Sequence, residues 1–130
     1  MKLSIVISTY NRAKSLSRTL ASVKSVADEI IVVDNESPDD TAAVAKKFGA
    51  KVYIRPNNLM LNVNKNYGFT KASGDWILCL DDDEEITAEL AREIKEAMNT
   101  LDVAGYWIPR KNIIFGRFIQ HGIWWPDQQL

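Results

Sequence analysis

The sequence is poor in several features that would define a class of protein. It has a single cysteine, Cys79, so a scaffold held by internal disulfides is excluded. No apolar run approaches the ~20 residues that a membrane-spanning helix needs. The first residues, Met1–Ser8, turn polar too soon for a signal peptide. We therefore expect a protein of the reducing cytoplasm.

A surplus of positive charge is also missing. Lys and Arg number 16 against 17 Asp and Glu, and the net charge is −1. A nucleic-acid binder held by a basic surface is therefore not expected. With 130 residues, 46% of them hydrophobic, the chain has the composition of one ordinary globular domain.

Three glycine-bearing motifs are absent, and each absence excludes a class of enzyme. No G-x-G-x-x-G follows the first apolar run, which argues against a dinucleotide-dependent dehydrogenase. Neither a P-loop nor a G-x-S-x-G nucleophile elbow is present. Ser8-Thr9-Tyr10 stands where a phosphatase or receiver domain would place an aspartate.

What the sequence does contain is an alternation of short apolar runs and helical patterns. The runs are continuously hydrophobic and rich in Val and Ile, which is typical of strands buried on both faces of a parallel sheet. They lie at Leu3–Ser8, Glu29–Val33, Lys51–Ile54 and Trp76–Leu80. Helices are predicted around Leu16–Val23, Ser37–Phe48, Asn62–Ala72 and Thr87–Met98. The order predicts an α/β fold, an open and mostly parallel Rossmann-like sheet with helices on both faces.

Local signals predict the ends of the second helix. Ser37 is placed to be its N-cap and Pro38 its first helical residue. Gly49 is placed to end the same helix in a left-handed conformation.

The pattern changes after Leu101. A strand is predicted at Tyr106–Pro109, and Gly116 marks a hairpin within Lys111–Ile119. Trp124 and Trp125 lie close to the chain's end, where bulky aromatics are unusual unless further chain or a ligand covers them. We therefore expect a truncated part of a longer protein.

Polar clusters follow three of the predicted strands, at the edge of the sheet where ligands bind in such folds. They are Ser8–Arg12, Asp34–Ser37 and Asp81–Glu85. Five adjacent carboxylates repel one another, and a bound Mg²⁺ or Mn²⁺ would relieve that repulsion. The alternative is a solvated helix N-terminus, which suits Glu84 and Glu85 better than Asp81 and Asp83.

For most of the other candidate residues the sequence allows both a ligand-binding role and a structural role. Asp34 can hydrogen-bond a ribose or a base edge, or it can cap the turn that follows it. Tyr10 can stack on a base, or it is a rim aromatic. Lys65 can pair with a diphosphate, or it is a solvated helical lysine. Ser37 and the lone His121 are expected to have structural or surface roles.

Three segments together resemble the signatures of family 2 glycosyltransferases with the GT-A fold. They are Leu3–Arg12, Ile31–Thr41 and Gly74–Glu84, in order and at the proper spacing. Within that family the chain looks most similar to bacterial enzymes of lipopolysaccharide core assembly. The carriers of that likeness are Lys65-Asn66, Ile108–Asn112, Gly116-Arg117 and His121–Leu130.

The resemblance implies an inverting, metal-dependent enzyme. Its donor would be a nucleotide sugar, first of all a UDP-sugar, and its cofactor Mg²⁺ or Mn²⁺. The acceptor would be a hydroxyl of a saccharide or lipid-linked saccharide, in lipopolysaccharide or another cell-envelope glycan. Peripheral association with the inner face of the cytoplasmic membrane is also implied, and no nucleic acid.

The resemblance further implies the domain and the roles of its residues. Residues 1–130 would form a single nucleotide-sugar-binding domain whose acceptor side is incomplete after about residue 105. Nucleotide binding would fall to Thr9, Tyr10, Asp34, Asn35, Lys65 and Asp81, and metal binding to Asp83 and Asp81. Asn35 stands where many relatives have a second aspartate, which bears on base preference. The general base would be Asp127 or a residue after Leu130.

Two alternatives remain open. The chain could be a non-catalytic nucleotide-binding module that lacks an acceptor site, and we expect this chain alone to bind a donor but to transfer sugar poorly. A nucleotidyltransferase would have the same sheet, but it would carry a glycine-rich, arginine-containing loop after the first strand, which is missing here.

Overall fold

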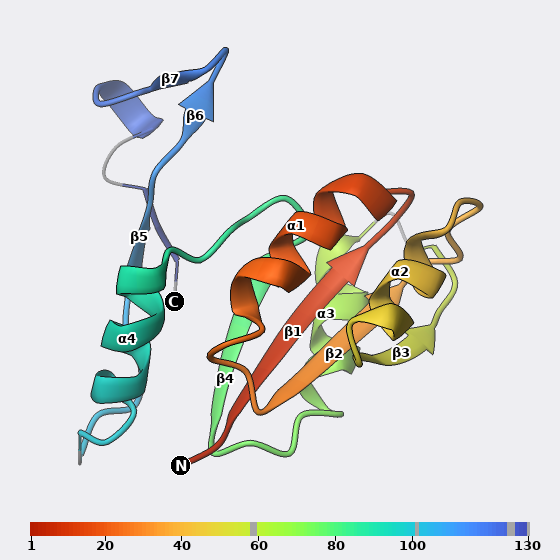
Figure 1. The fold of residues 1–130 in the computed structure, drawn as a ribbon, viewed down its shortest axis with the longest axis horizontal. Coiled ribbons are helices and arrows are strands. Elements are labelled where there is room, and N and C mark those ends of the chain that lie inside the picture. The colour runs from red at the N-terminus through yellow and green to blue at the C-terminus, as the bar shows by residue number, and fades with distance from the viewer. Residues whose placement is uncertain (58–59, 101, 125–126, 130) are drawn as a thin grey trace. The chain divides into compact units, whose positions relative to one another are not determined.

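The computed structural model describes residues 1–57, 60–100, 102–124 and 127–129, and the chain divides into two compact units. The N-terminal unit spans Met1–Asn99 and the C-terminal unit Thr100–Leu130. Strands and helices alternate in the N-terminal unit (Figure 1): β1 (Leu3–Thr9), α1 (Ala13–Val23), β2 (Glu29–Asp34), α2 (Thr41–Lys47), β3 (Lys51–Ile54), α3 (Leu61–Phe69), β4 (Trp76–Asp81) and α4 (Ala88–Ala97).

The four strands of the N-terminal unit form one parallel sheet in the order β3-β2-β1-β4. β1 therefore lies between β2 and β4, with Thr9 opposite Asp34 and Ser8 opposite Asp81. The polar residues that end these three strands meet at one edge of the sheet. The predicted open, parallel α/β architecture is confirmed.

Helices cover both faces of the sheet, because successive strand residues point to opposite sides. Ile5 and Ile7 of β1 share one core cluster with Leu16 and Leu20 of α1. Val6 belongs to a second cluster, which the aromatic residues of α3 cover. Figure 1 shows α1 and α2 in front of the sheet and α3 behind it. The longest described helix, α1, has 11 residues, and none of the described helices is long and apolar enough to cross a membrane.

A glycine sets how closely α3 approaches the sheet. A β-carbon at Gly68 would lie 2.5 Å from Cγ1 of Val6 and 3.2 Å from Cγ2 of Val33. Real β-carbons do not come so near, so the helix and the sheet can pack at this distance only because residue 68 has no side chain.

The predicted start of α2 is wrong by several residues. The helix begins at Thr41 with Asp40 as its N-cap, whereas Ser37 and Pro38 precede it. The hydroxyl of Ser37 is used elsewhere, because it donates to Asp34 and accepts from the backbone N–H of Asn11. The predicted end is confirmed, since Gly49 follows the helix with φ of +80°.

The C-terminal unit is built from short strands. They are β5 (Ile108–Arg110), β6 (Ile113–Ile114), β7 (Arg117–Phe118) and β8 (Asp127–Gln129), with a 3₁₀ turn at Gly122–Trp124. β5 pairs antiparallel with β8, and β6 with β7. The hairpin predicted around Gly116 is therefore present, and the predicted strand at Tyr106–Pro109 begins two residues later, at Ile108. Trp125 lies outside the described residues.

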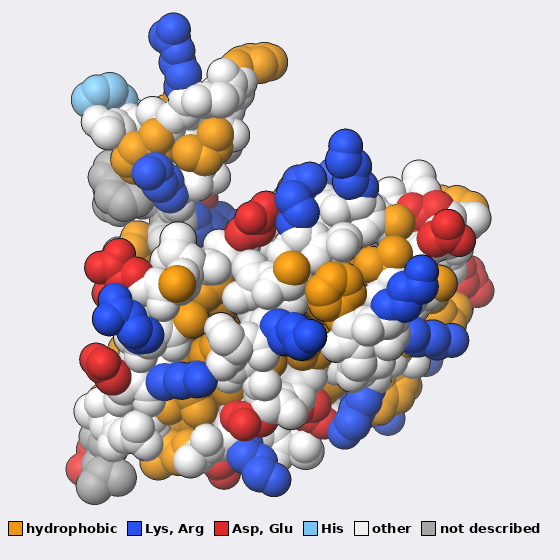
Figure 2. Space-filling model, in the orientation of Figure 1, with side chains coloured by type: hydrophobic (Ala, Val, Ile, Leu, Met, Phe, Trp, Pro, Cys, Tyr) orange, Lys and Arg blue, Asp and Glu red, His pale blue; other side chains and the backbone are white. Residues whose placement is uncertain are grey.

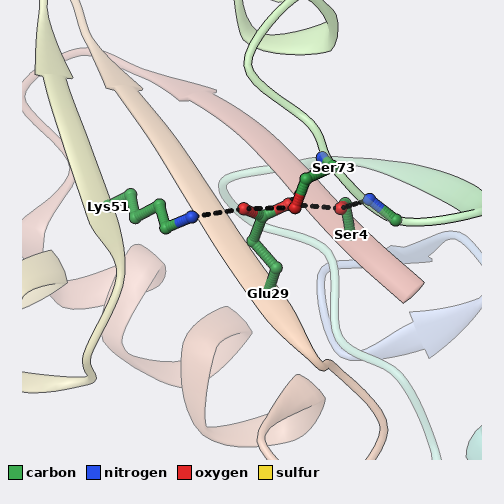
Figure 3. Close-up of polar contacts among 5 residues, drawn as sticks. Ser4, Glu29, Lys51 and Ser73 are labelled. Carbon is green, nitrogen blue, oxygen red and sulfur yellow. Dashed lines mark hydrogen bonds and ion pairs between the residues drawn. The ribbon is translucent and has the colours of Figure 1, made fainter. Parts of the chain in front are cut away.

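A partly buried carboxylate, that of Glu29, connects the amino ends of the strands (Figure 3). Glu29 accepts hydrogen bonds from Ser4 Oγ at 2.5 Å, from Lys51 Nζ at 2.6 Å and from the backbone N–H of Ser73 at 2.9 Å. Ser4 Oγ accepts in turn from the backbone N–H of Gly74 at 2.9 Å. Lys51 and Ser4 lower the pKa of Glu29 to about 2, against the opposing effect of burial. Glu29 thus connects β1, β2, β3 and the segment that leads into β4.

We predict that Glu29→Gln destabilises the fold in a pH-dependent way. The folded-state pKa is about 2 against an ordinary 4.5, so the stabilisation is fully present above pH 4.5 and is lost as the pH falls toward 2. It amounts to at most about 3 kcal/mol. Urea unfolding at neutral pH should show that the variant has lost most of this stabilisation. Between pH 4.5 and 2 the parent chain should lose the same stabilisation, whereas the variant should lose little more.

Glu93→Gln, an exposed change on α4, is the matched control and should shift stability by about 0.5 kcal/mol or less. Equal unfolding curves for Glu29→Gln and Glu93→Gln at neutral pH would show that the tie contributes nothing.

Candidate functional site

The carboxyl ends of β1, β2 and β4 form the candidate site. The backbone N–H of Asn35 donates to the carbonyl of Thr9 at 2.9 Å, which joins the loops after β2 and β1. Asp81 ends β4 on the other side of β1. The structure therefore brings together the predicted residues Thr9, Tyr10, Asp34, Asn35 and Asp81. Tyr10 is 44% exposed, so its ring is available to a ligand at this edge.

The middle carboxylate of the acidic run faces β1. Thr9, which is buried, donates its hydroxyl to Asp82 at 2.7 Å. Burial raises the pKa of Asp82, and the hydrogen bond from Thr9 and the charge of Arg12 offset that rise only in part. The sequence reading passed over Asp82, because an alternating pair of aspartates assigns the ligand roles to its neighbours. The hydroxyl of Thr9 is consequently committed to Asp82.

Asp34 lies beneath the loop that follows β2. It is only 2% exposed, and its carboxylate accepts from both the hydroxyl and, at 3.2 Å, the backbone N–H of Ser37. These contacts are those of a residue that caps a turn, which is one of the two roles that the sequence allows for Asp34. Asn11 and Glu36, in the two loops at this edge, have φ of 53° and 56°. Such left-handed conformations of non-glycine residues are uncommon and cluster at functional sites. Nucleotide binding by Asp34 stays a prediction.

An asparagine of α3 fixes the orientation of Asn35. Asn64, which is buried, donates from Nδ2 to the carbonyl of Pro56 at 3.0 Å and also to Oδ1 of Asn35. A backbone carbonyl can only accept, so the Asn64 atom facing it must be the nitrogen. Asn35 then presents its oxygen to Asn64 and its nitrogen to Ser8 Oγ, at 3.2 Å. The amide of Asn35 keeps one further N–H to offer. Asn64 was not predicted; its one signal is a short polar residue inside an otherwise helical segment.

Lys65 joins the site through Asp81. Its ammonium lies 2.5 Å from Oδ1 of Asp81. Burial acts to lower the pKa of Lys65, but the hydrogen bond to Asp81 and the nearby carboxylates of Asp81 and Glu84 oppose it, and the pKa is raised. Lys65 is therefore a cation at neutral pH, and it already neutralises one of the two carboxylates predicted to hold a metal ion.

The two glutamates of the acidic run have structural contacts. Glu84 accepts from the backbone N–H of Asp81 at 2.8 Å, which closes the turn after β4. Glu85 pairs with Arg18 at 3.1 Å, and both side chains are more than half exposed. An ion pair so open to water contributes little to stability. Both glutamates are thus engaged by partners within the protein.

The acidic run fits a shared cation rather than a cage built by the protein alone. Within the part of the chain that the structure describes, no group of three or more His, Cys, Asp or Glu is arranged to hold a metal ion. Asp83 is exposed and Asp81 is half-buried, so the run offers two carboxylates. Mg²⁺ is commonly held by one or two carboxylates together with substrate phosphates and water. The donor set therefore suits a divalent cation that arrives with a diphosphate.

Asp127, the predicted general base, belongs to the C-terminal unit. Its carboxylate lies 2.8 Å from Nη2 of Arg110 and accepts from Nδ2 of Asn112 at 3.2 Å. The hydrogen bonds from Arg110 and Asn112 hold the pKa of Asp127 below its usual range. A carboxylate stabilised in this way is a weaker base, and its catalytic role stays a prediction. His121 is exposed in the same unit.

Comparison with known proteins identifies the class. Residues 4–129 match the family model described as glycosyl transferase family 2, and the chain belongs to that family. An uncharacterized glycosyltransferase of Rickettsia conorii is 45% identical over 94 residues, which cover 72% of this chain and 33% of that protein. The chain thus spans about a third of the length of this relative.

Two solved structures share the fold. Staphylococcus aureus TarS, residues 1–349, is 25% identical with a TM-score of 0.68, over 87% of this chain and 40% of that one. Glucosyl-3-phosphoglycerate synthase of Mycobacterium tuberculosis in complex with UDP is also 25% identical, with a TM-score of 0.52, over 64% and 34%. The family and the fold inferred from the three signatures are confirmed.

We predict that Asp34→Ala lowers the free energy of unfolding by about 1–3 kcal/mol, because it removes the buried carboxylate that accepts from the backbone N–H and the hydroxyl of Ser37. Asp40→Ala is the matched control: Asp40 is exposed, and its side chain makes no capping hydrogen bond, so the change should cost about 0.5 kcal/mol or less. Chemical unfolding of both variants measures the difference. A stable Asp34→Ala protein would show that the turn closes without this carboxylate.

Proposed function

We propose that the carboxyl edge of β1, β2 and β4 binds the nucleoside diphosphate of a nucleotide-sugar donor, and that the protein transfers the sugar to a hydroxyl acceptor with inversion. One observation carries the proposal. In a family 2 chain, a cation (Lys65), two carboxylates (Asp81 and Asp83) and an exposed aromatic (Tyr10) lie at this edge, beside the loop that begins at the buried Asp34.

The nucleoside half of the donor falls to the loops after β1 and β2. Tyr10 stacks on the base, and Asn35 offers its remaining N–H to an acceptor on the base edge. Asp34 and Thr9 shape the floor beneath them. A UDP-sugar is the first donor to test, since the mycobacterial synthase that shares the fold binds UDP.

The diphosphate half falls to the acidic run and α3. Asp83 and Asp81 would hold a Mg²⁺ or Mn²⁺ ion, which when bound neutralises the charge that builds up on the departing diphosphate. Lys65 pairs with Asp81 before the donor arrives and is positioned to turn its ammonium to a phosphate oxygen when the cation takes its place. Asp81 then exchanges one positive partner for another and is not left as an unpaired, partly buried charge.

Attack on the sugar requires an acceptor hydroxyl that loses its proton. A carboxylate base within hydrogen-bond reach performs that step, and in-line attack on the face opposite the diphosphate inverts the anomeric centre. Asp127 is the candidate within this chain. The acceptor we propose is a saccharide or lipid-linked saccharide of lipopolysaccharide or another envelope glycan. The resemblance of residues 108–112, 116–117 and 121–130 to lipopolysaccharide core enzymes supports it.

A second candidate function is a nucleotide-binding module without transfer. The contacts of Asp127 favour it, because two donors already occupy this carboxylate. One experiment in two steps, binding and then transfer, distinguishes the two functions at its second step. Calorimetric titration with UDP-, GDP-, ADP- and CMP-sugars, with and without Mn²⁺, tests binding, and release of the free nucleotide in the presence of a lipid-linked acceptor tests transfer. No binding of any donor would overturn both.

We predict that Asp83→Ala removes the Mn²⁺-dependent gain in UDP affinity while it leaves metal-free binding unchanged. The loss should be at least about tenfold, the lower range for losing even an outer partner of a metal ion. The exposed Asp40→Ala serves as the control and should keep the full metal response. If Asp83→Ala also kept it, the cation would lie elsewhere.

We predict that Lys65→Met shifts Mn²⁺ binding in two opposite directions. Without nucleotide, Mn²⁺ alone should bind several-fold more tightly, because the competing ammonium has been removed from Asp81. With UDP present, the affinity for the nucleotide should fall, because its diphosphate loses a cation. Titration of Mn²⁺ and of UDP measures each effect separately, with Lys14→Met on the exposed side of α1 as the control. An unchanged affinity for Mn²⁺ alone would contradict the exchange of partners at Asp81.

A further inference from the structure

The C-terminal unit exposes large hydrophobic side chains to an unusual degree. Those described as exposed there are Tyr106, Trp107, Ile113, Phe115 and Ile123. The hairpin of β6 and β7 presents two of them. Ile113 is 58% exposed, and Phe115 at the turn is fully exposed. Exposed apolar groups gathered in one small segment are a mark of an interaction surface.

The turn of this hairpin holds Phe115 in a costly conformation. Phe115 and Gly116 both have positive φ, 49° and 73°, as a two-residue hairpin turn of this type requires. Asn, Asp and Gly suit that position, whereas a bulky aromatic is an outlier there. Because the ring of Phe115 is fully exposed, packing within the chain does not offset the conformational strain of its positive φ. Its apolar surface is available to an outside partner.

Charge around the hairpin is of one sign. Lys111 and Arg117 flank its turn, and the stretch from residue 103 to residue 126 contains no Asp or Glu. Arg110 in the same stretch is paired with Asp127 and adds no net charge. Lys111 Nζ sits 4.7 Å from the ring centroid of Phe118, on the hairpin itself. Figure 2 shows orange and blue side chains together at the upper end, where Figure 1 places β6 and β7. The rest of the chain carries the surplus of acidic residues, since the whole chain has a net charge of −1.

We propose that the β6–β7 hairpin docks on the surface of a lipid bilayer that contains anionic lipids. Phe115 and Ile113 enter the boundary between headgroups and acyl chains, and Lys111 and Arg117 meet the lipid phosphates. A single aromatic at the tip of a two-residue turn is a convex point, which a fluid bilayer accommodates. A stable protein partner would instead need about 800 Å² of matching surface.

The docking extends the proposed function, and only its purpose, to bring the chain close to a lipid-linked acceptor, rests on that function. A lipid-linked acceptor has its saccharide at the membrane surface, so a hairpin held there would keep the chain close to that acceptor. Binding to vesicles itself needs neither a donor nor an acceptor, and it can therefore be measured without any sugar transfer.

Co-sedimentation of the full chain with vesicles tests the proposal. We expect binding to phosphatidylcholine vesicles that contain phosphatidylglycerol, weaker binding to phosphatidylcholine alone, and loss of binding as salt is raised. Phe115→Ser should lower the partition coefficient about tenfold or more, as expected for an aromatic side chain that no longer leaves water. Ile54→Ser removes a side chain about as exposed as Ile113 (55% against 58%) from β3 and should leave binding unchanged.

The charges are tested in the same way. Arg117→Gln should lower binding to the anionic vesicles about fivefold, and Lys14→Gln on α1 should not lower it. Failure of the parent chain to sediment with anionic vesicles, or equal binding by Phe115→Ser and Ile54→Ser, would overturn the proposal. Concentration-dependent dimers in analytical ultracentrifugation that Phe115→Ser abolishes would overturn it as well and assign the tip to a second copy.

UDP titration of the same proteins distinguishes failure of the membrane-docking proposal from failure of the proposed function. Normal UDP binding by a chain that ignores vesicles overturns the docking alone. Vesicle binding by a chain that binds no donor overturns the function alone. Unfolding curves for each variant show whether the hairpin substitutions leave the fold intact.

Discussion

The parallel pairing of β1 with both β2 and β4 is the constraint on which the rest of the N-terminal unit depends. It aligns Thr9 with Asp34 and Ser8 with Asp81, so loops that are far apart in the chain end at one edge. At the opposite edge, Glu29 holds the entries of the same strands in place (Figure 3). A slip of one residue in either pairing would turn the buried residues of β1 to the wrong face and separate the site residues.

Much of this fold could be predicted from the sequence because its signals are local. Continuous apolar runs mark the four strands, and the spacing of Leu16, Leu20 and Val23 marks the buried side of α1. The start of α2 could not be read in the same way. Ser37 has the chemistry of an N-cap, but a tertiary partner, Asp34, takes its hydroxyl. Capping signals fail where another part of the chain competes for the same side chain.

The sequence predicted which strand ends carry the residues of the candidate site, but it did not predict the contacts that these side chains make. Residues at the carboxyl ends of strands, such as Asp34 and Asp81, were identified from their positions. Asn64 and Asp82 were missed because their roles come from partners 29 and 73 residues away in the chain. The ion pair of Lys65 with Asp81 likewise depends on how α3 lies against the sheet, which no pattern in either segment encodes. The orientation of the Asn35 amide depends on the carbonyl of Pro56 for the same reason.

The missing side chain at Gly68 has a consequence for how substitutions in this protein are to be interpreted. Gly68 and Lys65 lie three positions apart in α3, almost one turn, so a helix pushed outward by a methyl group at residue 68 would carry the ammonium of Lys65 away from Asp81. Such a change would imitate the loss of Lys65 itself, although Gly68 lies against Val6 and Val33 in the core. In a mutational scan scored by donor binding, a purely steric position would rank among the chemical ones.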